Sequence, residues 1–402
     1  MKVRIVTLGC KLNFAESSAL MNELIARGHE RAQKGEEADL VIVNTCTVTH
    51  TADQKDRQAI HRVRRENPHA RLIVTGCYAR LKPKEIADMA EVDRVVTKRE
   101  DIFQPAYSKD DRTRCFLKVQ DGCNYFCTYC AIPYARGRSR NPSISFVSEQ
   151  AMQALQQGAK EIVLTGVNIG DFGRSTGERF IDLLRALDSL PYDLPYRLRI
   201  GSVEPNLLSD EIIDFVAHSK HIAPHFHIPL QSGSDEVLRI MNRHYNTALF
   251  RARIEHIRHV LPHAFIGVDC MVGVRGETES CWKEYVSFVE SLDVSQLHVF
   301  TYSERQGTRM LAMDIPVVPM AERHRRSQVL HQISEKKLRT FYQDHQNETV
   351  TVLWEAKNDH GVMYGFTENY IRCSRPFDSA RINTFESLTH HIVTAPDKEN
   401  IG

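Results

Sequence analysis

Over the first hundred residues, short apolar runs alternate with polar stretches whose hydrophobic positions are spaced as on a helix. The runs Val3–Leu8, Leu40–Val43 and Leu72–Val74 are rich in Val and Ile, which is typical of buried parallel strands. Ser17–Ala26 and Ala52–Glu66 lie between them and carry helix formers at amphipathic spacing. This strand–helix alternation predicts a doubly wound parallel sheet, in a first domain over residues 1–108.

A polar, charged stretch at Gln104–Arg114 interrupts this pattern and is predicted to be a linker. Alternation then resumes over residues 109–340, where helices are expected at Ser148–Gln157, Arg179–Leu190 and Ser280–Leu292. The strand candidates are Cys115–Val119, Glu161–Leu164, Tyr196–Ile200, His225–Ile228, Phe265–Val272 and Gln296–Phe300. Six such units predict a partial (β/α)6, TIM-like barrel whose chemistry sits at the carboxyl ends of its strands.

The chain changes character after a basic helix expected at Glu322–Arg339, which carries a net charge of +4. From about Phe341 onward the apolar runs are short and β-like: Thr349–Leu353, Gly361–Phe366 and Ile392–Thr394. They predict a small C-terminal β-barrel over residues 341–402.

Composition narrows the class of protein. The 402 residues are 42% hydrophobic and 26% charged, which excludes a disordered chain, a collagen and a small disulfide scaffold. The chain has no 18-residue apolar stretch and its first residues hold too short an apolar run for a signal peptide, so no membrane partner and a cytoplasmic location are expected. Because the formal charge is only +1, any binding of nucleic acid must depend on local patches.

Ten cysteines are the one oddity of the composition, and three of them follow the three N-terminal apolar runs within a few residues. The carboxyl ends of parallel strands lie at one edge of a sheet, so Cys10, Cys46 and Cys77 are expected to converge. One such cysteine alone would be interpreted as a small buried hydrophobe. Three at equivalent strand ends, each preceded by small or polar residues, favour a shared role, and in a reducing compartment metal binding is the commoner one.

A second set, Cys123, Cys127 and Cys130, has C-x3-C-x2-C spacing directly after a predicted strand. Three thiolates this close can bind three irons of a 4Fe–4S cluster and leave the fourth iron open to another ligand. A structural zinc ion is the alternative, although closed zinc sites take four protein ligands. Cys115 would supply the fourth only if its strand folded back toward the loop.

The motif and its surroundings, Gln120–Arg138, resemble the radical S-adenosylmethionine (SAM) enzymes, and most closely their methylthiotransferase branch. The resemblance extends over nearly the whole chain. It implies that Cys123, Cys127 and Cys130 hold a 4Fe–4S cluster whose open iron binds SAM, the source of a 5′-deoxyadenosyl radical. It also implies a second 4Fe–4S cluster on Cys10, Cys46 and Cys77, a flavodoxin- or Rossmann-like N-terminal fold and a C-terminal TRAM module. Cys115, Cys270, Cys281 and Cys373 lack such partners and are interpreted as structural.

The same resemblance predicts which residues bind SAM. They lie next to the cluster motif or just after predicted strands: Tyr129, Gly166, Ser202, Glu204, Gln231 and Gly273. Tyr129 is expected near the adenine, Gly166 gives the backbone close access to the amino acid moiety, and Ser202 and Glu204 offer a hydroxyl and a carboxylate. His225, His227 and His244 are expected to pack or hydrogen-bond rather than to bind metal. The chain departs from the family at Val274-Arg275, where Phe-Pro is usual, which leaves the edge of the pocket open to question.

Three stretches resemble the branch that methylthiolates N6-threonylcarbamoyladenosine 37 of tRNA: Thr7–Asn13, Asn44–Asp53 and Gly365–Tyr370. This resemblance implies the tRNA anticodon loop as substrate and a flavodoxin or ferredoxin as electron donor. Isopentenyladenosine 37 of tRNA and an aspartate of a ribosomal protein remain alternative substrates. A non-catalytic zinc and RNA-binding protein and a simple electron carrier are the alternatives of other classes.

Local charge gives limited support for RNA. Asp111–Arg140 holds six basic and two acidic residues, and Thr51–Glu66 holds five and three. Together with Glu322–Arg339 these stretches are candidates for phosphate contact, or else ordinary solvated faces. The segment Tyr342–Gly402 carries a net charge of −4, so RNA binding there would depend on aromatic stacking. The candidates for stacking are Trp354, Tyr364 and Tyr370.

Overall fold

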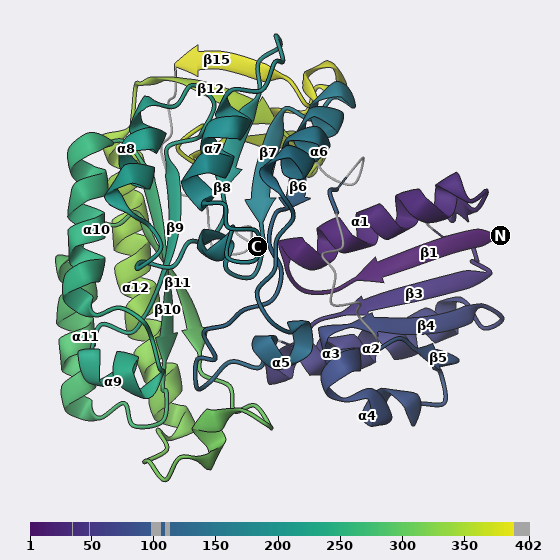
Figure 1. Cartoon of the computed structure of the whole chain (residues 1–402), viewed down its shortest axis with the longest axis horizontal. Coiled ribbons are helices and arrows are strands. Elements are labelled where there is room, and N and C mark those ends of the chain that lie inside the picture. The colour runs from purple at the N-terminus through teal and green to yellow at the C-terminus, as the bar shows by residue number, and fades with distance from the viewer. Residues whose placement is uncertain (34, 48, 98–105, 109–112, 390–402) are drawn as a thin grey trace.

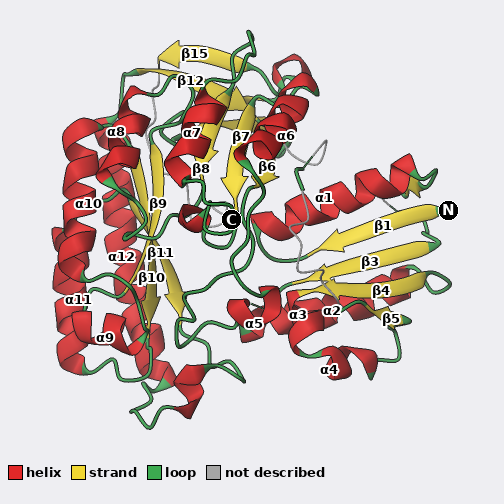
Figure 2. Cartoon of the chain, in the orientation of Figure 1, coloured by secondary structure: helices red, strands yellow, loops and turns green. Residues whose placement is uncertain are grey.

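The computed structural model describes residues 1–402 except 34, 48, 98–105, 109–112 and 390–402 (Figure 1). An N-terminal sheet flanked by helices lies beside a central set of parallel strands with helices on their outer side, and a small C-terminal sheet covers the strands at one end (Figures 1 and 2). The predicted run Ile392–Thr394 lies outside the described residues, as does most of the predicted linker.

The N-terminal sheet is parallel, with strand order β2-β1-β3-β4-β5. Its strands are β1 (Lys2–Thr7), β2 (Glu30–Arg31), β3 (Leu40–Thr45), β4 (Arg71–Gly76) and β5 (Arg94–Val95). Its helices are α1 (Lys11–Ala26), α2 (His50–Glu66), α3 (Cys77–Leu81) and α4 (Pro83–Ala87). The prediction of a parallel sheet is confirmed, but α1 begins six residues before the predicted Ser17. The first turns of α1 are buried against the central strand β6. Their hydrophobic positions are therefore set by two packing partners, β6 and their own sheet, and do not show the simple spacing of a helix on one sheet.

Six parallel strands follow in the central part, in two sheets of three, β6-β7-β8 and β11-β10-β9. They are β6 (Arg114–Lys118), β7 (Glu161–Thr165), β8 (Arg197–Ile200), β9 (His225–Gln231), β10 (Phe265–Val272) and β11 (Gln296–Thr301). Parallel bridges from Ser202 to His227 and from Leu198 to Ile222 join the two sheets, so the strands are ordered as in the sequence. All six predicted strands are confirmed.

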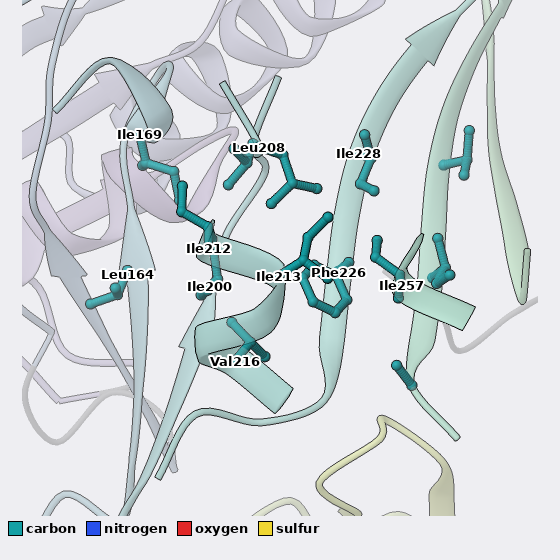
Figure 3. Packing of buried hydrophobic residues seen from close by; sticks show 14 of the residues in the cluster. Leu164, Ile169, Ile200, Leu208, Ile212, Ile213, Val216, Phe226, Ile228 and Ile257 are labelled. Carbon is teal, nitrogen blue, oxygen red and sulfur yellow. The ribbon is translucent and has the colours of Figure 1, made fainter. Parts of the chain in front are cut away.

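Helices cover the outer side of these strands (Figure 2). They are α6 (Ile144–Gln156), α7 (Phe180–Asp188), α8 (Asp210–His218), α9 (Asp235–Ile240), α10 (Thr247–Val260), α11 (Glu279–Ser291) and α12 (Met320–Asp344). The short helix α5 (Ile132–Arg136) lies instead beside α3. Side chains alternate along a strand, so one row of each strand joins the helices in the main core, as Leu164, Ile200 and Phe226 do (Figure 3). The opposite row of β6, β7 and β8 includes Lys118, Glu161 and Arg199, all buried. The inner side of these strands therefore holds buried charged groups beside apolar ones such as Phe116 and Val163.

The C-terminal sheet is antiparallel, with strand order β14-β13-β12-β15. Its strands are β12 (Thr349–Trp354), β13 (Val362–Phe366), β14 (Arg372–Pro376) and β15 (Phe385–Thr389). Val352, Trp354 and Met363 form a small core of its own. Two of the predicted β runs are thus confirmed as strands, while closure into a barrel stays a prediction.

Candidate functional site: two cysteine sets and the strand ends between them

The loop between β6 and α5 carries Cys123, Cys127 and Cys130. Reciprocal backbone hydrogen bonds between Asp121 and Arg140, both 2.9 Å, close this loop at its base. The amide of Cys130 donates to the carbonyl of Cys127 at 3.0 Å, and Phe126 has a positive φ of 49°, so the backbone turns tightly between the cysteines. The three predicted ligands therefore lie on one compact turn at the carboxyl end of β6.

Burial governs the chemistry of these three thiols. It raises the pKa of Cys123 to about 11 and that of Cys130 to about 12, and it also raises the pKa of Cys127. Neighbouring thiols add to the rise in the pKa of Cys123 and of Cys130, since a second thiolate nearby disfavours the first. One of these thiols is buried and two are half-buried, and thiols with such raised pKa values become thiolates readily only when a metal centre supplies positive charge. The site therefore suits a metal cluster and does not suit free nucleophiles.

Arg243 is the functional residue that the sequence analysis missed. It follows α9 and is almost fully buried, and it donates to the Cys127 Sγ at 3.2 Å and to the Tyr129 hydroxyl at 3.4 Å. It also forms an ion pair with Glu204. Tyr129 and Glu204, both predicted to contact SAM, are thus brought together beside the cysteine loop by one guanidinium. Arg243 lies far from the cysteines in the sequence, and no local motif marked it.

The other predicted SAM residues lie at the ends of successive strands. Ser202 bridges to His227 after β8, and Gly273 follows β10 with a positive φ of 76°. A Cβ on Gly166 would come within 2.9 Å of the Gln120 carbonyl, so only glycine fits between β7 and the cysteine loop. Gln231 ends β9 with φ of 65°, and its Oε1 is buried without a hydrogen-bond partner in the described part of the chain.

Two further observations fit a polar ligand at this edge. Asp171, just beyond β7, also has a buried carboxylate oxygen that lacks a partner among the described residues. Buried polar atoms are nearly always hydrogen-bonded, so orphan oxygens on Asp171 and Gln231 indicate a group that completes them. Gln120 stiffens the same edge: its Oε1 accepts from the amides of Val167 and Asn168 at 3.0 and 2.8 Å, and its Nε2 donates to Gly122 at 2.8 Å.

The departure from the family at Val274-Arg275 preserves the turn. Val274 is fully buried in an apolar cluster that Tyr129 borders, and Arg275 pairs with Glu304 at 3.0 Å. The Glu277 carboxylate accepts from the Gly273 amide at 3.0 Å and from Arg326 at 2.6 Å. Arg326 therefore takes part in holding the turn.

The second cysteine set lies where the N-terminal sheet faces the central strands. Cys10 immediately precedes α1, Cys46 follows β3 and Cys77 begins α3. A Cβ on Gly9 would lie 2.6 Å from the Cys46 Sγ, and Cys10 and Cys77 interact electrostatically. The predicted convergence of these three cysteines agrees with these proximities, and all ten cysteines of the chain are free thiols.

Arg136, from α5 of the central domain, lies beside this second set. Its guanidinium interacts electrostatically with Cys77 and Cys10 and donates to Asn13 Oδ1 at 2.6 Å. The charge of Arg136 opposes the rise that burial causes in the pKa of Cys10. The cation next to the N-terminal cysteines therefore comes from the segment that follows the other cysteine loop.

Within the described ranges, no three His, Cys, Asp or Glu side chains gather closely enough to hold one metal ion. A structural zinc ion needs four ligands at about 2.0–2.3 Å from one point. A 4Fe–4S cluster distributes its thiolates over separate irons and so does not need its ligands gathered around one point. His225 stacks on Phe265, and His244 stacks on Tyr125. His227 forms a hydrogen bond with Asp269 at 2.7 Å. These three histidines therefore pack or hydrogen-bond, as the sequence predicts.

The basic stretches are less available to RNA than their charge counts suggest. In α12, Arg323 and Arg326 are buried and bond to protein groups, and Arg325 pairs with Glu322 at 2.6 Å. Lys118, Arg136 and Arg140 likewise pair with Asp121. The hypothesis of a phosphate-binding face is wrong for Arg323, Arg326, Lys118 and Arg136, because these side chains are buried and bonded inside the protein. For Arg325, whose side chain is half exposed, it stays a prediction.

Two of the three aromatic candidates for base stacking were predicted wrongly. Trp354 is 1% exposed in the core of the C-terminal sheet, and its indole donates to Glu386. Tyr370 packs against Phe366 and bonds Arg114 at 3.1 Å. Tyr364 is covered by the Arg372 guanidinium at 3.7 Å from its ring centre. Their aromatic rings serve folding and docking of the sheet.

Comparison with known proteins agrees with this site. The profile of the uncharacterized protein family UPF0004 matches residues 2–97, and that of the radical SAM superfamily matches residues 117–289. The second match contains the loop of Cys123, Cys127 and Cys130 and the strand ends described above, which defines a radical SAM protein.

Similarity over nearly the full length is more specific. The chain is 35% identical to threonylcarbamoyladenosine tRNA methylthiotransferase MtaB of Bacillus subtilis, over 91% of this chain and 88% of that protein. It is 33% identical to MtaB of Aquifex aeolicus, over 93% and 97%. A tRNA-2-methylthio-N(6)-dimethylallyladenosine synthase of Clostridium botulinum is 29% identical, over 90% and 88%. The chain belongs to the radical SAM methylthiotransferase family.

Solved structures show the same fold at low identity. The radical SAM methyltransferase TsrM from Kitasatospora setae superimposes with a TM-score of 0.52 at 15% identity, over 75% of this chain and 74% of that one. The cobalamin-dependent radical SAM enzyme OxsB superimposes with a TM-score of 0.51 at 12% identity, over 83% and 56%. In the described part of the chain, no helix is both long and apolar enough to cross a membrane.

Proposed function

We propose that this enzyme adds a methylthio group to C2 of N6-threonylcarbamoyladenosine 37 in the anticodon loop of tRNA. The observation that carries the proposal is the 35% identity to a relative of that named activity, over 91% of the chain. The relatives named for dimethylallyladenosine are less similar, at 28–29% identity, so that substrate is the second candidate. C2 carries no acidic hydrogen, so its substitution needs radical chemistry rather than a side-chain base.

Cys123, Cys127 and Cys130 would hold the first 4Fe–4S cluster, with SAM on its open iron. When bound and reduced, this pair supplies a 5′-deoxyadenosyl radical that removes a hydrogen atom from the substrate. Arg243 keeps a positive charge against the Cys127 sulfur and fixes Glu204 and Tyr129 at the same edge. The orphan Oε1 of Gln231 is placed to accept from the ammonium or ribose groups of SAM.

Cys10, Cys46 and Cys77 would hold the second 4Fe–4S cluster, which carries the sulfur that becomes methylated and transferred. The fit rests on the close approach of Cys46 to Gly9 and on the cation of Arg136 beside Cys10 and Cys77. A cation at this distance stabilises thiolates and the negative charge of a cluster on them. SAM therefore has two uses in the proposed reaction, as radical source and as methyl donor.

The finer architecture belongs to the same proposal. We assign residues 1–108 to a flavodoxin-like domain, 109–340 to a partial (β/α)6 barrel and 341–402 to a TRAM-like module that helps to position tRNA. The electron donor is a small flavodoxin or ferredoxin of the cytoplasm. Since Trp354 is internal and Tyr370 is bonded to Arg114, we expect the C-terminal module to contact RNA through exposed polar groups.

Nucleoside mass spectrometry of tRNA tests the substrate. A strain that lacks this gene, and has no second enzyme of the family, should lose methylthio-threonylcarbamoyladenosine and accumulate its unmodified precursor. The wild-type gene should restore it, whereas genes with Cys46→Ala or Cys123→Ala should not. Loss of the methylthio-dimethylallyl nucleoside instead would establish the second candidate substrate and refute the first.

A further inference from the structure

Two aromatic rings and a guanidinium lie together on the outside of the first cysteine loop. Phe126, between Cys123 and Cys127, is half-buried, and Tyr134 on α5 is 49% exposed. Their ring centres lie 5.8 Å apart in an edge-to-face arrangement, with an interplanar angle of 75°. The guanidinium of Arg138 lies 5.9 Å from the centre of the Phe126 ring. Phe126, Tyr134 and Arg138 thus form an aromatic patch next to the proposed cluster.

The charge of the patch is not compensated. Arg136 and Arg140, on either side of it in the sequence, pair with Asp121 at 3.0 and 3.1 Å. Arg138 is exposed, and its side chain forms no hydrogen bond or ion pair with any residue that the structure describes. Residues 122–140 contain no Asp or Glu at all. One positive charge is therefore available there to an anionic partner.

The backbone that carries the patch is fixed to the cysteine loop. The Cys123 amide donates to the Gly137 carbonyl at 3.1 Å, and the Arg140 guanidinium donates to the Arg138 carbonyl at 3.2 Å. A Cβ on Gly122 would lie 2.0 Å from the Arg138 carbonyl oxygen, so the two segments touch closely. A partner that binds here meets a surface that is largely organised in advance, which lowers the entropic cost of binding.

The patch belongs to the one short segment that contacts both cysteine sets. On α5, Arg136 lies beside Cys10 and Cys77, and Tyr134 packs on Phe126 of the first cysteine loop. In the proposed reaction, adenosine 37 must be accessible to both sets. The nucleotides joined to it therefore come to lie close to α5.

We propose that the aromatic patch binds the anticodon loop, with Tyr134 stacked on the base next to adenosine 37 and Arg138 at an adjacent phosphate. The inference rests on the proposed function. Bases of a single-stranded loop have free π-faces, which aromatic side chains and arginine planes stack irrespective of sequence. A guanidinium is also well suited to bind phosphate. Holding the neighbouring nucleotide outside leaves adenosine 37 itself free to enter the site as a single unstacked base.

Stem-loop binding by reconstituted holoenzyme tests the stacking directly. Fluorescence anisotropy gives the Kd for anticodon stem-loops with N6-threonylcarbamoyladenosine, either intact or with an abasic nucleotide before or after position 37. The wild type should bind one of the abasic loops about 5- to 100-fold more weakly than the intact loop, which is the usual effect of losing one stacked base.

The variants assign that loss to the patch. Tyr134→Leu should bind the intact loop as weakly as the wild type binds the abasic one, and should treat both loops alike within about twofold. Tyr134→Phe keeps the ring and should behave as the wild type. Arg138→Gln, at an exposed side chain, should reduce the slope of log Kd against log salt concentration by about 1. Leu194→Ala is the matched control, because Leu194 is 55% exposed and precedes β8, at the opposite end of the strands from the cysteine loop.

Iron content is measured for every variant and should equal that of the wild type. If Tyr134→Leu still discriminates the abasic loop as the wild type does, or Arg138→Gln keeps the wild-type salt slope, the patch inference is overturned and the proposed function stands. Unchanged RNA binding together with slower reduction of the cluster by a flavodoxin would also overturn it, because the patch would then serve a protein partner. If the wild type binds the stem-loop but forms no methylthio nucleoside on it with SAM and reductant, the proposed function itself fails.

Discussion

The densest buried ionic network of the protein joins the N-terminal domain to the central strands, and Asp121 lies at its centre. Its carboxylate accepts from Lys118 at 2.9 Å, Arg136 at 3.0 Å and Arg140 at 3.1 Å, and Asp121 itself is fully buried. Glu16 of α1 completes the network from the other domain, with Lys118 at 2.8 Å and Arg136 at 3.2 Å. We predict that Asp121→Asn, which preserves shape and removes the charge, destabilises this junction more than any single cation variant does.

The magnitude follows from what each change leaves behind. With Asp121→Asn, three cations remain buried beside one another and only Glu16 is left to balance them. Removing one partner of a buried pair costs about 3–5 kcal/mol. With Arg136→Met, Asp121 and Glu16 each keep a cation, so the expected cost is about 1.5–3 kcal/mol, the value of a charged hydrogen bond. Asp182→Asn, which affects an exposed pair with Arg179, should cost at most about 1 kcal/mol.

Thermal unfolding of the metal-free protein, followed by tryptophan fluorescence, measures this order. At about 2–4 °C per kcal/mol, Asp121→Asn should lower Tm by at least about 4 °C relative to the Asp182→Asn control. Arg136→Met should fall between these two variants. If Asp121→Asn and Asp182→Asn unfold within about 2 °C of each other, the network contributes little and the reasoning is refuted.

Three further predictions concern other parts of the molecule. The two arginines beside Glu161 hold the pKa of its carboxyl group below the usual range. The ionised carboxylate therefore contributes its full stability above the pKa of glutamate in the unfolded chain, about 4.3. This contribution is lost as the pH falls toward the pKa of Glu161 in the folded protein. The difference in Tm between the wild type and Glu161→Gln should be constant above about pH 5 and shrink below about pH 4; a difference that grows on acidification would contradict the assignment. Cys46→Ala and Cys123→Ala should each retain about four of eight irons after anaerobic reconstitution, and only Cys46→Ala should still cleave SAM; loss of cleavage in both would show that the two sites are not independent. Gly76→Ala should lower the iron content of the N-terminal site, because the added Cβ would lie 2.4 Å from the Thr45 backbone. Gly28→Ala is the control: Gly28 also has a positive φ, but its Cβ would meet open space, so this variant should keep its iron. Equal iron content in both variants would refute the steric explanation.

The strands and the cysteine positions could be predicted from the sequence because their causes are local. A strand buried on both faces needs a continuous apolar run, and β3 and β10 show such runs plainly. A cysteine placed within a few residues of such a run, as Cys46 is, must then lie at the carboxyl edge of the sheet. The predicted ends of α1 and α12 were less accurate, since both helices extend into contacts with other domains that local spacing does not encode.

The partners of charged side chains could not be predicted, because they depend on which segments fold together. Arg243 follows α9 but pairs with Glu204, which follows β8. Arg326 on α12 bonds Glu277, which lies 49 residues earlier in the chain. From the sequence, Arg326 was one of six basic residues on an apparently solvated face. Its burial inverts that interpretation, because a buried cation paired within the protein has no charge left for phosphate.

The two cysteine sets belong to different domains, so a reaction that uses both depends on how firmly the domains are held together. Arg136 fastens the junction beside Cys10 and Cys77. A second contact lies near Cys46, where buried Arg305 of the central domain bonds Asp53 at 2.8 and 3.1 Å. One contact alone would allow the N-terminal part to rotate about it, whereas two separate contacts oppose rotation. Since transfer between two centres requires a fixed separation, we expect both arginines to matter for the proposed reaction through the geometry of the junction, without touching the substrate.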